Sequence, residues 1–464
     1  MNYEDFVARK LETVAPSGLS QPFCLPDSLF PMQRDLVGWG LRRGRSAIFA
    51  DTGLGKSRMQ IAWADEVVRR TGGNVMILAP LAVAAQTVRE GADIDVHITH
   101  CREPEDVRPG INITNYDRIH KFDCSQFVGV VLDESSCIKH HTSRTFDQLV
   151  IAFANTPYRL CATATPAPND WTELGTHAEF LGVCTRSEML AEFFVHDGGD
   201  TQTWRLKGHA RHLFWRWVSQ WGACVRKPSD LGYDDSAYRL PALHETEHMV
   251  SVDESNLVSD GMLFALEASS LMERRAARKE SMDARVKACA DLVNASSEPW
   301  VIWGEYNAET EALVRLIEGA VEIAGPDKPD VKEQRLADFA DGRLRVLVTK
   351  PSIAGWGLNW QHCAHMAFVG VSDSFEAYYQ AVRRCYRFGQ KREVHVHLFS
   401  SQIEGAVLAN LRRKQGDAIA MGEALAAETS AAVKAAIGGT KRQSNPYNAA
   451  RKVTPPAWLR SDAA

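Results

Sequence analysis

Two glycines, a lysine and a serine stand together in the stretch "TGLGKS", which follows the apolar run "SAIFA". Gly53 and Gly55 can adopt positive φ, so backbone N–H groups there can approach a phosphate closely. Lys56 would reach the β- and γ-phosphates, and Ser57 would ligate Mg²⁺ at the start of a helix. The general phosphate-loop pattern has its first glycine where this chain has Ala50, so a plain strand–turn–helix is the alternative. Lys-Ser directly after two glycines has little packing rationale and favours phosphate binding.

A carboxylate pair ends the apolar run "VVLDES". A phosphate loop needs an acid at the end of a second strand to hold Mg²⁺, and Asp133 is placed for it. Glu134 could orient or deprotonate an attacking water. A charged turn leaving a strand is the alternative, but this pair and the loop together favour a nucleotide site more than either does alone.

Three polar side chains recur at helical spacing in "QAVRRCYRFGQ". Gln380, Arg384 and Arg387 are four and three residues apart, so they would share one face of the helix expected over 374–388. Such a face can present two guanidinium groups to a γ-phosphate held elsewhere in the molecule. An arginine-rich solvated helix is the alternative.

Short apolar runs alternate with helix-like stretches such as 56–70 in the first part of the chain. Buried strands that alternate with helices are typical of a parallel α/β sheet. The first set of expected strands is 46–50, 74–80, 110–116, 127–134 and 158–166. The second set is 299–306, 320–325, 344–350, 364–370 and 393–399, with helices from Asn307, over 331–341 and over 374–388.

Between the two sets the chain is rich in Trp, His and Arg, most of all over 203–235. Leu213, Trp217 and Trp221 are four residues apart and form an apolar helix face, which favours core packing over base stacking. The arginines of this stretch can still reach a DNA backbone from the polar side.

Composition leaves the function open. The 464 residues are 45% hydrophobic and 24% charged, with a net charge of −5, as in ordinary globular proteins. No apolar run reaches the length of about 18 residues that a membrane span needs. The ten cysteines form no C-x-x-C pair, and the charged N-terminus is unlike a signal peptide, so we expect a reducing cytosol. "QHCAHM" has no second cluster at ligand spacing, so we predict no metal site there.

Taken in order, these motifs resemble superfamily 2 helicases, and within them the Swi/Snf-like translocase branch, especially small members encoded by phages. The resemblance covers roughly residues 28–415. "ADTGLGKS" matches that family's form of the phosphate loop, in which Ala50 is normal, and "QAVRRCYRFGQ" matches its sixth motif. "ATATP" and "VTKPSIAGWGLNW" resemble its third and fifth motifs.

The resemblance implies two tandem RecA-like parallel-sheet lobes, ATP and Mg²⁺ as ligands, and DNA as the partner of a monomer without membrane contact, in a bacterial or phage-infected cytosol. The expected parts are an N-terminal extension (1–27), a first lobe (28–250) with a helical insertion (about 174–240), a helical connection (251–298), a second lobe (299–425) and a flexible basic tail (426–464).

The resemblance also assigns site residues. Nucleotide contacts would come from Gln33, Thr52, Gly53, Gly55, Lys56, Ser57 and Gly357. Catalysis would rest on Lys56, Asp133, Glu134, Arg384 and Arg387, with Ser57 and Asp133 at Mg²⁺. Residues that couple the ATP site to the lobe interface would be Ser136, Thr163, Thr165 and Gln380. Nucleic-acid contacts would be Thr114, Asn115, Tyr116, Thr349, Lys350, Trp356 and Asn359; for Trp356, stacking and plain packing are equally open.

Two departures from the family pattern matter. Ser136 stands where the family has histidine, and "GVSDSFEAYY" replaces the D-x-W-N-P-like segment. The missing segment weakens the assignment to the remodelling proteins proper but not the assignment to a motor. The resemblance therefore implies an ATP-dependent nucleic-acid motor, and we expect a translocase on double-stranded DNA. A strand-separating helicase on single strands or RNA, and an ATP-gated binding protein, are the alternatives.

Overall fold

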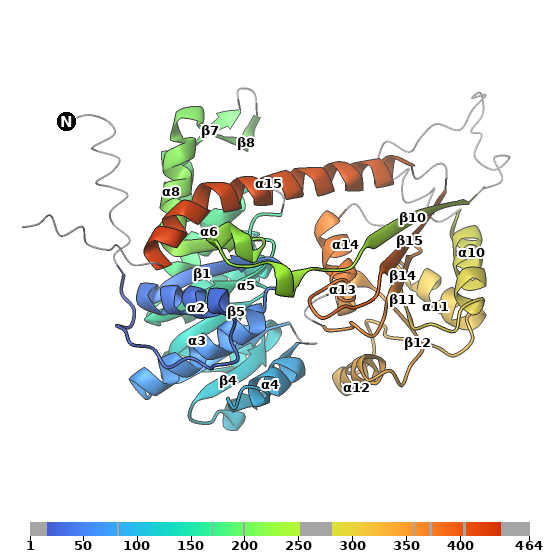
Figure 1. Ribbon diagram of the computed structural model, residues 1–464, viewed down its shortest axis with the longest axis horizontal. Coiled ribbons are helices and arrows are strands. Elements are labelled where there is room, and N and C mark those ends of the chain that lie inside the picture. The colour runs from blue at the N-terminus through green and yellow to red at the C-terminus, as the bar shows by residue number, and fades with distance from the viewer. Residues whose placement is uncertain are drawn as a thin grey trace, which may run out of the picture.

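Two parallel β-sheets, each with helices packed on its faces, form two lobes that lie side by side (Figure 1). The structure is a computed structural model and describes residues 16–80, 83–168, 170–197, 200–250, 281–355, 358–370, 374–401 and 405–437. The expected α/β class with two parallel-sheet lobes is confirmed.

The first lobe has a seven-stranded sheet in the order β3-β4-β2-β5-β6-β1-β9. Its strands are β1 (Arg45–Ala50), β2 (Asn74–Ala79), β3 (Ile98–His100), β4 (Ile111–Asn115), β5 (Phe127–Asp133), β6 (Tyr158–Ala162) and β9 (Gly222–Val225). Its helices are α2 (Pro31–Arg43), α3 (Lys56–Thr71), α4 (Ala84–Ala92), α5 (Arg144–Ala152), α6 (Leu174–Leu181), α7 (Arg186–Phe193) and α8 (Arg211–Trp221).

Both faces of this sheet are buried, as its apolar strands require. Side chains alternate between the faces along a strand, so Ile48 packs with α2 and α3 while Phe49 packs with α6 and α8. The short 3₁₀ helices are η1 (Pro104–Asp106), η2 (Tyr116–Lys121), η3 (Cys124–Gln126), η4 (Ser135–Ile138), η5 (Trp171–Glu173), η6 (Gly208–Ala210), η7 (Pro228–Leu231) and η8 (Ser236–Tyr238).

The second lobe has a six-stranded sheet in the order β10-β15-β14-β11-β13-β12. Its strands are β10 (Leu243–Val250), β11 (Trp300–Trp303), β12 (Ala320–Glu322), β13 (Val346–Thr349), β14 (His365–Phe368) and β15 (Val394–Ser401). Its helices are α10 (Met282–Asn294), α11 (Asn307–Leu316), α12 (Pro329–Ala340), α13 (Pro351–Ala354) and α14 (Phe375–Val382). α10 and α11 share a core on one face, and α12 and α14 cover the other.

The region expected as an insertion is partly integral to the first lobe. A hairpin of β7 (Phe194–Asp197) and β8 (Asp200–Leu206) projects from it, but β9 pairs in parallel with β1, with Ala47 opposite Gly222 and Ala50 opposite Val225. Trp217 and Trp221 of α8 are buried, so the prediction that this aromatic face packs in the core is confirmed.

The expected boundary at residue 250 is wrong, because β10 belongs to the second sheet. It pairs with β15 from Leu243 opposite Val394 to Val250 opposite Ser401. The last part of the expected connection, α10, packs in the second lobe's core. Residues 251–280 lie outside the described part.

The last helix, α15 (Gly405–Ile437), runs along both lobes (Figure 1). Its 33 residues give it a length of about 50 Å. Leu408 and Leu411 pack in the second lobe's core, whereas Leu425 and Val433 pack in the first lobe's. The prediction of a flexible tail from residue 426 is therefore wrong for residues 426–437, which are helical. Residues 438–464 lie outside the described part.

Candidate active site between the two lobes

The predicted phosphate loop connects β1 to α3 and is shaped by two glycines. Gly53 has a φ of 91° and Gly55 a φ of 82°, in the left-handed region that favours glycine. A Cβ on Gly55 would lie 2.3 Å from Nε2 of Gln33. That amide donates to the Leu54 carbonyl at 2.9 Å and accepts from the Phe30 N–H at 3.0 Å. Gln33 therefore braces the loop from α2.

Lys56 opens α3 and places its ammonium group under the loop. Its Nζ donates to the carbonyl oxygen of Ala50 at 3.0 Å. Desolvation lowers the pKa of Lys56, and the carboxylates of Glu134 and Asp51 oppose that shift. A cation in such a weakly hydrated place interacts strongly with an anionic ligand.

Asp133 ends β5 and is buried beside a second carboxylate. Gln60, one turn after Lys56 on α3, donates from Nε2 to Oδ1 of Asp133 at 2.6 Å. Burial, and then the neighbouring Glu134, raise the pKa of Asp133 to about 7. Two desolvated carboxylates favour a cation between them and a phosphate, and the hydroxyl of Ser57 lines the same cavity. The residues present therefore fit a bound Mg²⁺.

Glu134 adopts a left-handed backbone conformation, with φ 50° and ψ 53°. A non-glycine residue in this region is strained, and such strain concentrates at functional sites. Oγ1 of Thr163, just after β6, donates to Oε2 of Glu134 at 3.4 Å. Thr163 therefore orients the carboxylate of Glu134.

The turn after the acid pair contains the two serines of "DESS". Oγ of Ser135 and Nε2 of His177 in α6 lie 3.0 Å apart. Oγ of Ser136 is buried with no partner among the described residues. His177 contacts the acid motif through the residue beside Ser136, a contact that no spacing in the sequence reveals.

The two predicted arginines follow α14 rather than lie on it. α14 ends at Val382, so the expected helix over 374–388 is too long and the shared helix face is wrong. Arg384 donates to the carbonyl of Gln380 at 2.8 Å and to its Oε1 at 3.0 Å. Both Arg384 and Arg387 donate to the Leu358 carbonyl, at 3.3 and 3.0 Å. Turn geometry, not a helix, fixes these guanidinium groups.

These groups from the two lobes line one cavity of about 390 Å³, which is in the size range of small-molecule sites. Its predicted lining residues are Gln33, Thr52, Gly53, Gly55, Lys56, Ser57, Asp133, Glu134, Arg384 and Arg387. The structure therefore brings together both halves of the expected ATP site, apart from Gly357, which lies outside the described residues.

Residues 285–389 match the family described as the helicase conserved C-terminal domain. The match supports a helicase of superfamily 1 or 2. It ends at the arginine motif and covers most of the second lobe. No curated protein matches the chain. Within the described residues no helix is long and apolar enough to cross a membrane, and no group of three His, Cys, Asp or Glu side chains is arranged to hold a metal ion.

Side chains join the second lobe to the first lobe around the cavity. Oδ1 of Asp51 accepts from the Tyr379 hydroxyl, and Oδ2 lies 3.7 Å from Nη2 of Arg383. Glu376 of α14 forms an ion pair with Lys139 and accepts from Oγ1 of Thr165 at 3.5 Å. Thr165 was predicted as a coupling residue; Asp51, Lys139 and Glu376 were not, because nothing in the sequence pairs residues more than 200 positions apart.

Three predicted nucleic-acid contacts are buried or hydrogen-bonded within the fold. Thr114 and Thr349 are fully buried in their strands, and Oγ1 of Thr349 donates to the Ile323 carbonyl at 3.0 Å. The Tyr116 hydroxyl donates to the Asp133 carbonyl at 2.6 Å. In this arrangement none of the three side chains is free to reach a phosphate, so the structure does not support that role for them.

The remaining predicted nucleic-acid contacts lie in different parts of the structure. Asn115 caps η2 by accepting from the Arg118 N–H at 3.1 Å, and Lys350 donates to Oδ1 of Asn307 at 2.5 Å. Asn359 lies on the wall of the cavity and donates to Oε1 of Glu90 at 3.2 Å, so the structure places it beside the predicted ATP-site residues. Trp356 lies outside the described residues.

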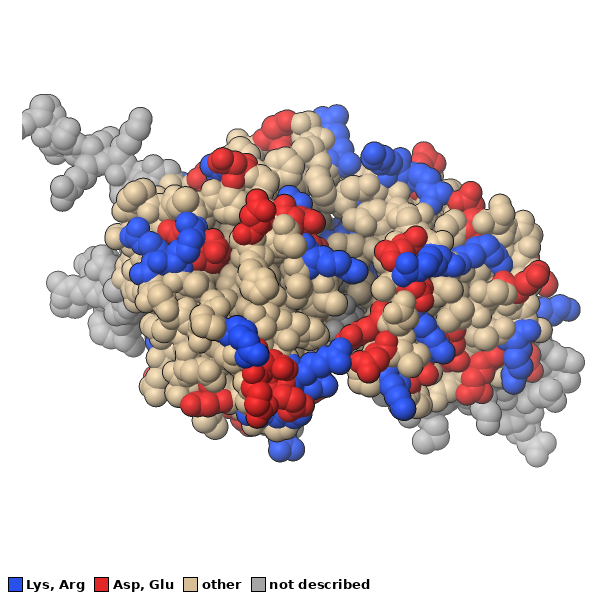
Figure 2. Space-filling view, turned by 90° about the horizontal axis from the view of Figure 1, so that it is seen from below, with Lys and Arg blue, Asp and Glu red and all other residues tan. Residues whose placement is uncertain are grey.

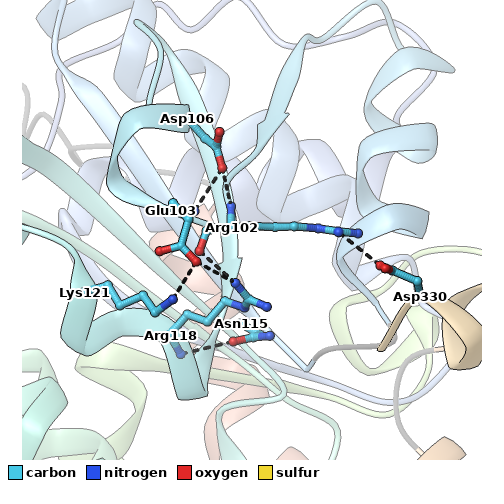
Figure 3. Close-up of polar contacts among 7 residues, drawn as sticks. All are labelled: Arg102, Glu103, Asp106, Asn115, Arg118, Lys121 and Asp330. Carbon is cyan, nitrogen blue, oxygen red and sulfur yellow. Dashed lines mark hydrogen bonds and ion pairs between the residues drawn. The ribbon is translucent and has the colours of Figure 1, made fainter. Parts of the chain in front are cut away.

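Side chains of both charge signs lie along the groove between the lobes (Figure 2). Arg102 of the first lobe reaches Asp330 on α12 of the second lobe at 3.1 Å (Figure 3). It also reaches Glu333 on the same helix at 3.2 Å. Lys121 pairs with Glu103 at 2.6 Å beside it. Acidic groups accompany the cations of this cluster, so it is not a plain basic patch.

Proposed function

We propose that this protein is an ATP-dependent nucleic-acid motor of superfamily 2, acting as a translocase on double-stranded DNA. One observation carries the proposal: Lys56 and Glu134 of the first lobe line the same cavity as Arg387 of the second. A site divided in this way is complete only while the lobes are together, so each catalytic cycle is linked to lobe movement.

The first lobe supplies phosphate binding. The backbone between Gly53 and Gly55 offers N–H groups at the start of α3, where the helix dipole favours an anion. Lys56 adds the charge that neutralises the β- and γ-phosphates. Ser57 and Asp133 would hold Mg²⁺, which when bound would offset the negative charge that develops on the phosphates.

Glu134 is the proposed base that orients and deprotonates water. Its backbone is left-handed, and Thr163 donates to its carboxylate. Arg384 and Arg387 would stabilise the charge on the transferred phosphoryl group. Burial lowers the pKa of Arg384 to about 10, so the group stays charged at neutral pH.

A chain of hydrogen bonds supports coupling between the base and the second lobe. Thr163 donates to Glu134 at 3.4 Å and accepts from the Thr165 N–H at 3.2 Å. Thr165 in turn donates to Glu376 on α14 at 3.5 Å. A shift of α14 would therefore move the Glu134 carboxylate through these hydrogen bonds. A motor requires this kind of link between lobe movement and hydrolysis.

The preference for duplex DNA rests on the resemblance of the motifs to the Swi/Snf-like branch, and the resemblance to small phage-encoded members belongs to the same proposal. ATP hydrolysis should be measured with duplex DNA, single strands, forks and RNA, with Lys56→Ala as the inactive control. We expect duplex DNA to stimulate turnover most, and the wild-type protein to displace a triplex-forming strand from the duplex in an ATP-dependent way.

Three results would change this proposal. Stimulation by single strands or RNA but not by duplex, together with displacement of a labelled complementary strand, would indicate an unwinding helicase instead. DNA binding that responds to ATP without any hydrolysis would indicate a gated binding protein. Hydrolysis that persists in Lys56→Ala would place the activity outside this cavity.

A further inference from the structure

A second cavity, of about 320 Å³, adjoins the phosphate loop. It shares Thr52 and Gly53 of that loop with the cavity that contains Lys56, and it extends to the segment after β9 and to the residues that follow α14. Four cationic side chains line it, and none of them lines the cavity that contains Lys56. We call them the basic cluster; its members are Arg226, Lys227, Arg239 and Arg383.

Positive charge is in excess in this second cavity. Its described lining includes two carboxylates, those of Asp51 and Asp235, against the four cations. Asp51 accepts from the Tyr379 hydroxyl, and its Oδ2 lies 3.7 Å from Nη2 of Arg383. Asp235 accepts from the Ser229 N–H at 2.7 Å. Both carboxylates therefore already have partners and do not neutralise the rest of the basic cluster.

Two members of the basic cluster have no ion-pair partner. Arg226 pairs with Glu423 of α15 at 3.0 Å, and even with Glu423 counted the cations remain in excess. The exposed side chains of Lys227 and Arg239 form no ion pair or hydrogen bond with any other residue that the structure describes. Ordinary solvated surface charge is the alternative. It does not explain why cations from three separate segments of the chain converge on one cavity.

A buried hydroxyl adds a hydrogen-bond donor to this cavity. Tyr238 lines it, and the Tyr238 hydroxyl has no hydrogen-bond partner among the described residues. Burial raises the pKa of Tyr238 to about 12, so the hydroxyl keeps its proton at neutral pH. A buried donor without an acceptor costs free energy, and an acceptor oxygen of a ligand in the cavity would satisfy it.

We propose that the basic cluster binds a small dianion that carries a phosphate group, such as inorganic phosphate or a phosphate monoester. At neutral pH such a group carries a charge of about −1.5 to −2 and offers several acceptor oxygens, which suits the excess of cations. Arginine and lysine are the side chains that proteins use most to bind phosphate. The cavity is too small to hold a nucleic-acid duplex, so the phosphate belongs to a small molecule. Arg226 and Lys227 belong to the first lobe and Arg383 to the second, so the bound anion would hold the lobes together.

Binding of inorganic phosphate to protein whose other cavity is filled tests this site. The cavity that contains Lys56 is first saturated with ADP and beryllium fluoride, which take the places proposed for the three phosphates of ATP. Inorganic phosphate is then titrated, and its binding is followed by phosphorus NMR. We expect one phosphate site in the filled wild-type protein, at which glycerol phosphate competes. The double variant Lys227→Ala, Arg239→Ala removes two charge-assisted contacts and should weaken this binding by roughly 10-fold or more, while ADP affinity stays unchanged.

Lys287→Ala removes an exposed cation that does not line the second cavity, and it serves as the matched control. Thermal unfolding of each variant checks that the fold is kept. Equal phosphate affinity in the wild type and the double variant, or no phosphate binding to the filled wild-type protein, overturns the phosphate site and leaves the motor proposal intact. Wild-type protein that does not bind ADP overturns the nucleotide site instead, and phosphate titration of Lys56→Ala with and without the double substitution then decides on the basic cluster. Competition by a short DNA duplex but not by glycerol phosphate overturns the assignment to a small molecule.

Discussion

The two halves of the cavity are each fixed within their own lobe. In the first lobe, Lys56 is held by the Ala50 carbonyl and Asp133 by Gln60. In the second, Arg384 and Arg387 share the Leu358 carbonyl. The two halves differ in the charged side chains that line the cavity. The first half contributes a lysine and two carboxylates, which suit a phosphate together with its cation, whereas the second contributes two arginines. The first half is therefore suited to bind, and the second to complete a reaction.

Removing one charge from each half should separate these roles most clearly. Arg387→Ala should lower kcat for ATP by roughly 1000-fold or more, as for arginine fingers in phosphoryl transfer, with little change in ADP affinity. Lys56→Ala should lose hydrolysis and also weaken ADP binding. Steady-state hydrolysis and calorimetry on the same preparations check both expectations.

Arg387→Lys is the informative companion, because a lysine keeps the charge but cannot donate from a planar fork. We expect it to remain strongly impaired. If Arg387→Ala turned over at the wild-type rate, the second lobe would contribute nothing to the chemistry and the division of roles would be wrong.

In the second lobe, breaking a buried ion pair should lower the free energy of unfolding more than breaking an exposed one. Arg285 and Glu309 form a fully buried ion pair at 3.0 Å. Arg285→Met leaves the Glu309 charge buried without its partner, which should destabilise the lobe by about 3–5 kcal/mol. Arg392→Met breaks an exposed pair with Glu298 at 2.7 Å and should cost at most about 1 kcal/mol.

Urea unfolding of the two variants compares these costs directly. Replacing both buried partners with apolar residues should recover much of the loss, since no isolated charge then remains. Equal midpoints for Arg285→Met and Arg392→Met would show that the buried pair does not hold the second lobe.

Acid should act on the first lobe through His177, which burial keeps neutral. Its pKa is lowered to about 4, whereas that of an unfolded histidine is about 6.5. The unfolded chain therefore binds more protons between these values, and stability is lost as pH falls from about 6.5 towards 4, by about 3 kcal/mol in all.

His177→Gln should remove this part of the pH dependence. Asp133, whose pKa is raised to about 7, contributes with the opposite sign, because its stabilising share is lost as pH rises. The difference between wild type and His177→Gln in unfolding free energy, measured from pH 7 to pH 4, isolates the histidine. Parallel curves would mean that His177 is not held neutral beside Ser135.

Local chemistry made the first half of the site predictable from the sequence. A phosphate loop is a contiguous segment whose glycine and lysine types follow from backbone conformation and charge, so Gly53, Gly55 and Lys56 could be placed by spacing alone. The parallel strands could be predicted for the same reason, since a buried strand such as "NVMILA" is apolar on both faces. Gln60 lies one turn after Lys56 and could have been found by helix spacing.

Other features depend on pairing at long range. β10, "LHETEHMV", is a largely exposed edge strand, and only its partner β15, about 150 residues later, shows which sheet it joins. β9 has only four residues and directly follows the aromatic helix α8 in the sequence, so no separate apolar run marks it as a strand. Two consecutive glycines follow Ile437, where α15 ends, and they mark its end better than the boundary at 425. α14 ends at Val382, and beyond it Arg384 and Arg387 donate to the Leu358 carbonyl. Helical periodicity does not reveal such a contact between distant residues.

Substitutions at the contacts between the two halves of the cavity should lower kcat less than substitutions of the charged groups that line it. Glu376 accepts from Thr165 and pairs with Lys139. Glu376→Gln keeps the size of the side chain but removes its charge, and a hydrogen bond to a charged group contributes about 1.5–3 kcal/mol. We therefore expect kcat to fall by roughly 10-fold while ADP affinity stays the same.

Hydrolysis with and without DNA measures this loss. Lys139→Ala should reproduce it, and the double variant should be no worse than either single one, since both remove the same contact. Additive losses would mean that Glu376 and Lys139 act independently.

The smallest effect is expected at the exposed contact between Arg102 and the acids of α12. The Arg102 side chain is 48% exposed and that of Asp330 78%, so water and salt screen the pair and it contributes at most about 1 kcal/mol. Arg102→Ala should change basal hydrolysis less than about 5-fold, and the change should vanish at high salt. Arg343→Ala, which breaks exposed pairs with Asp338 and Asp341 inside the second lobe, is the control with no contact to the first. If Arg102→Ala were as damaging as Glu376→Gln at high salt, lobe closure would depend on the rim of the groove rather than on the buried contacts beside the cavity.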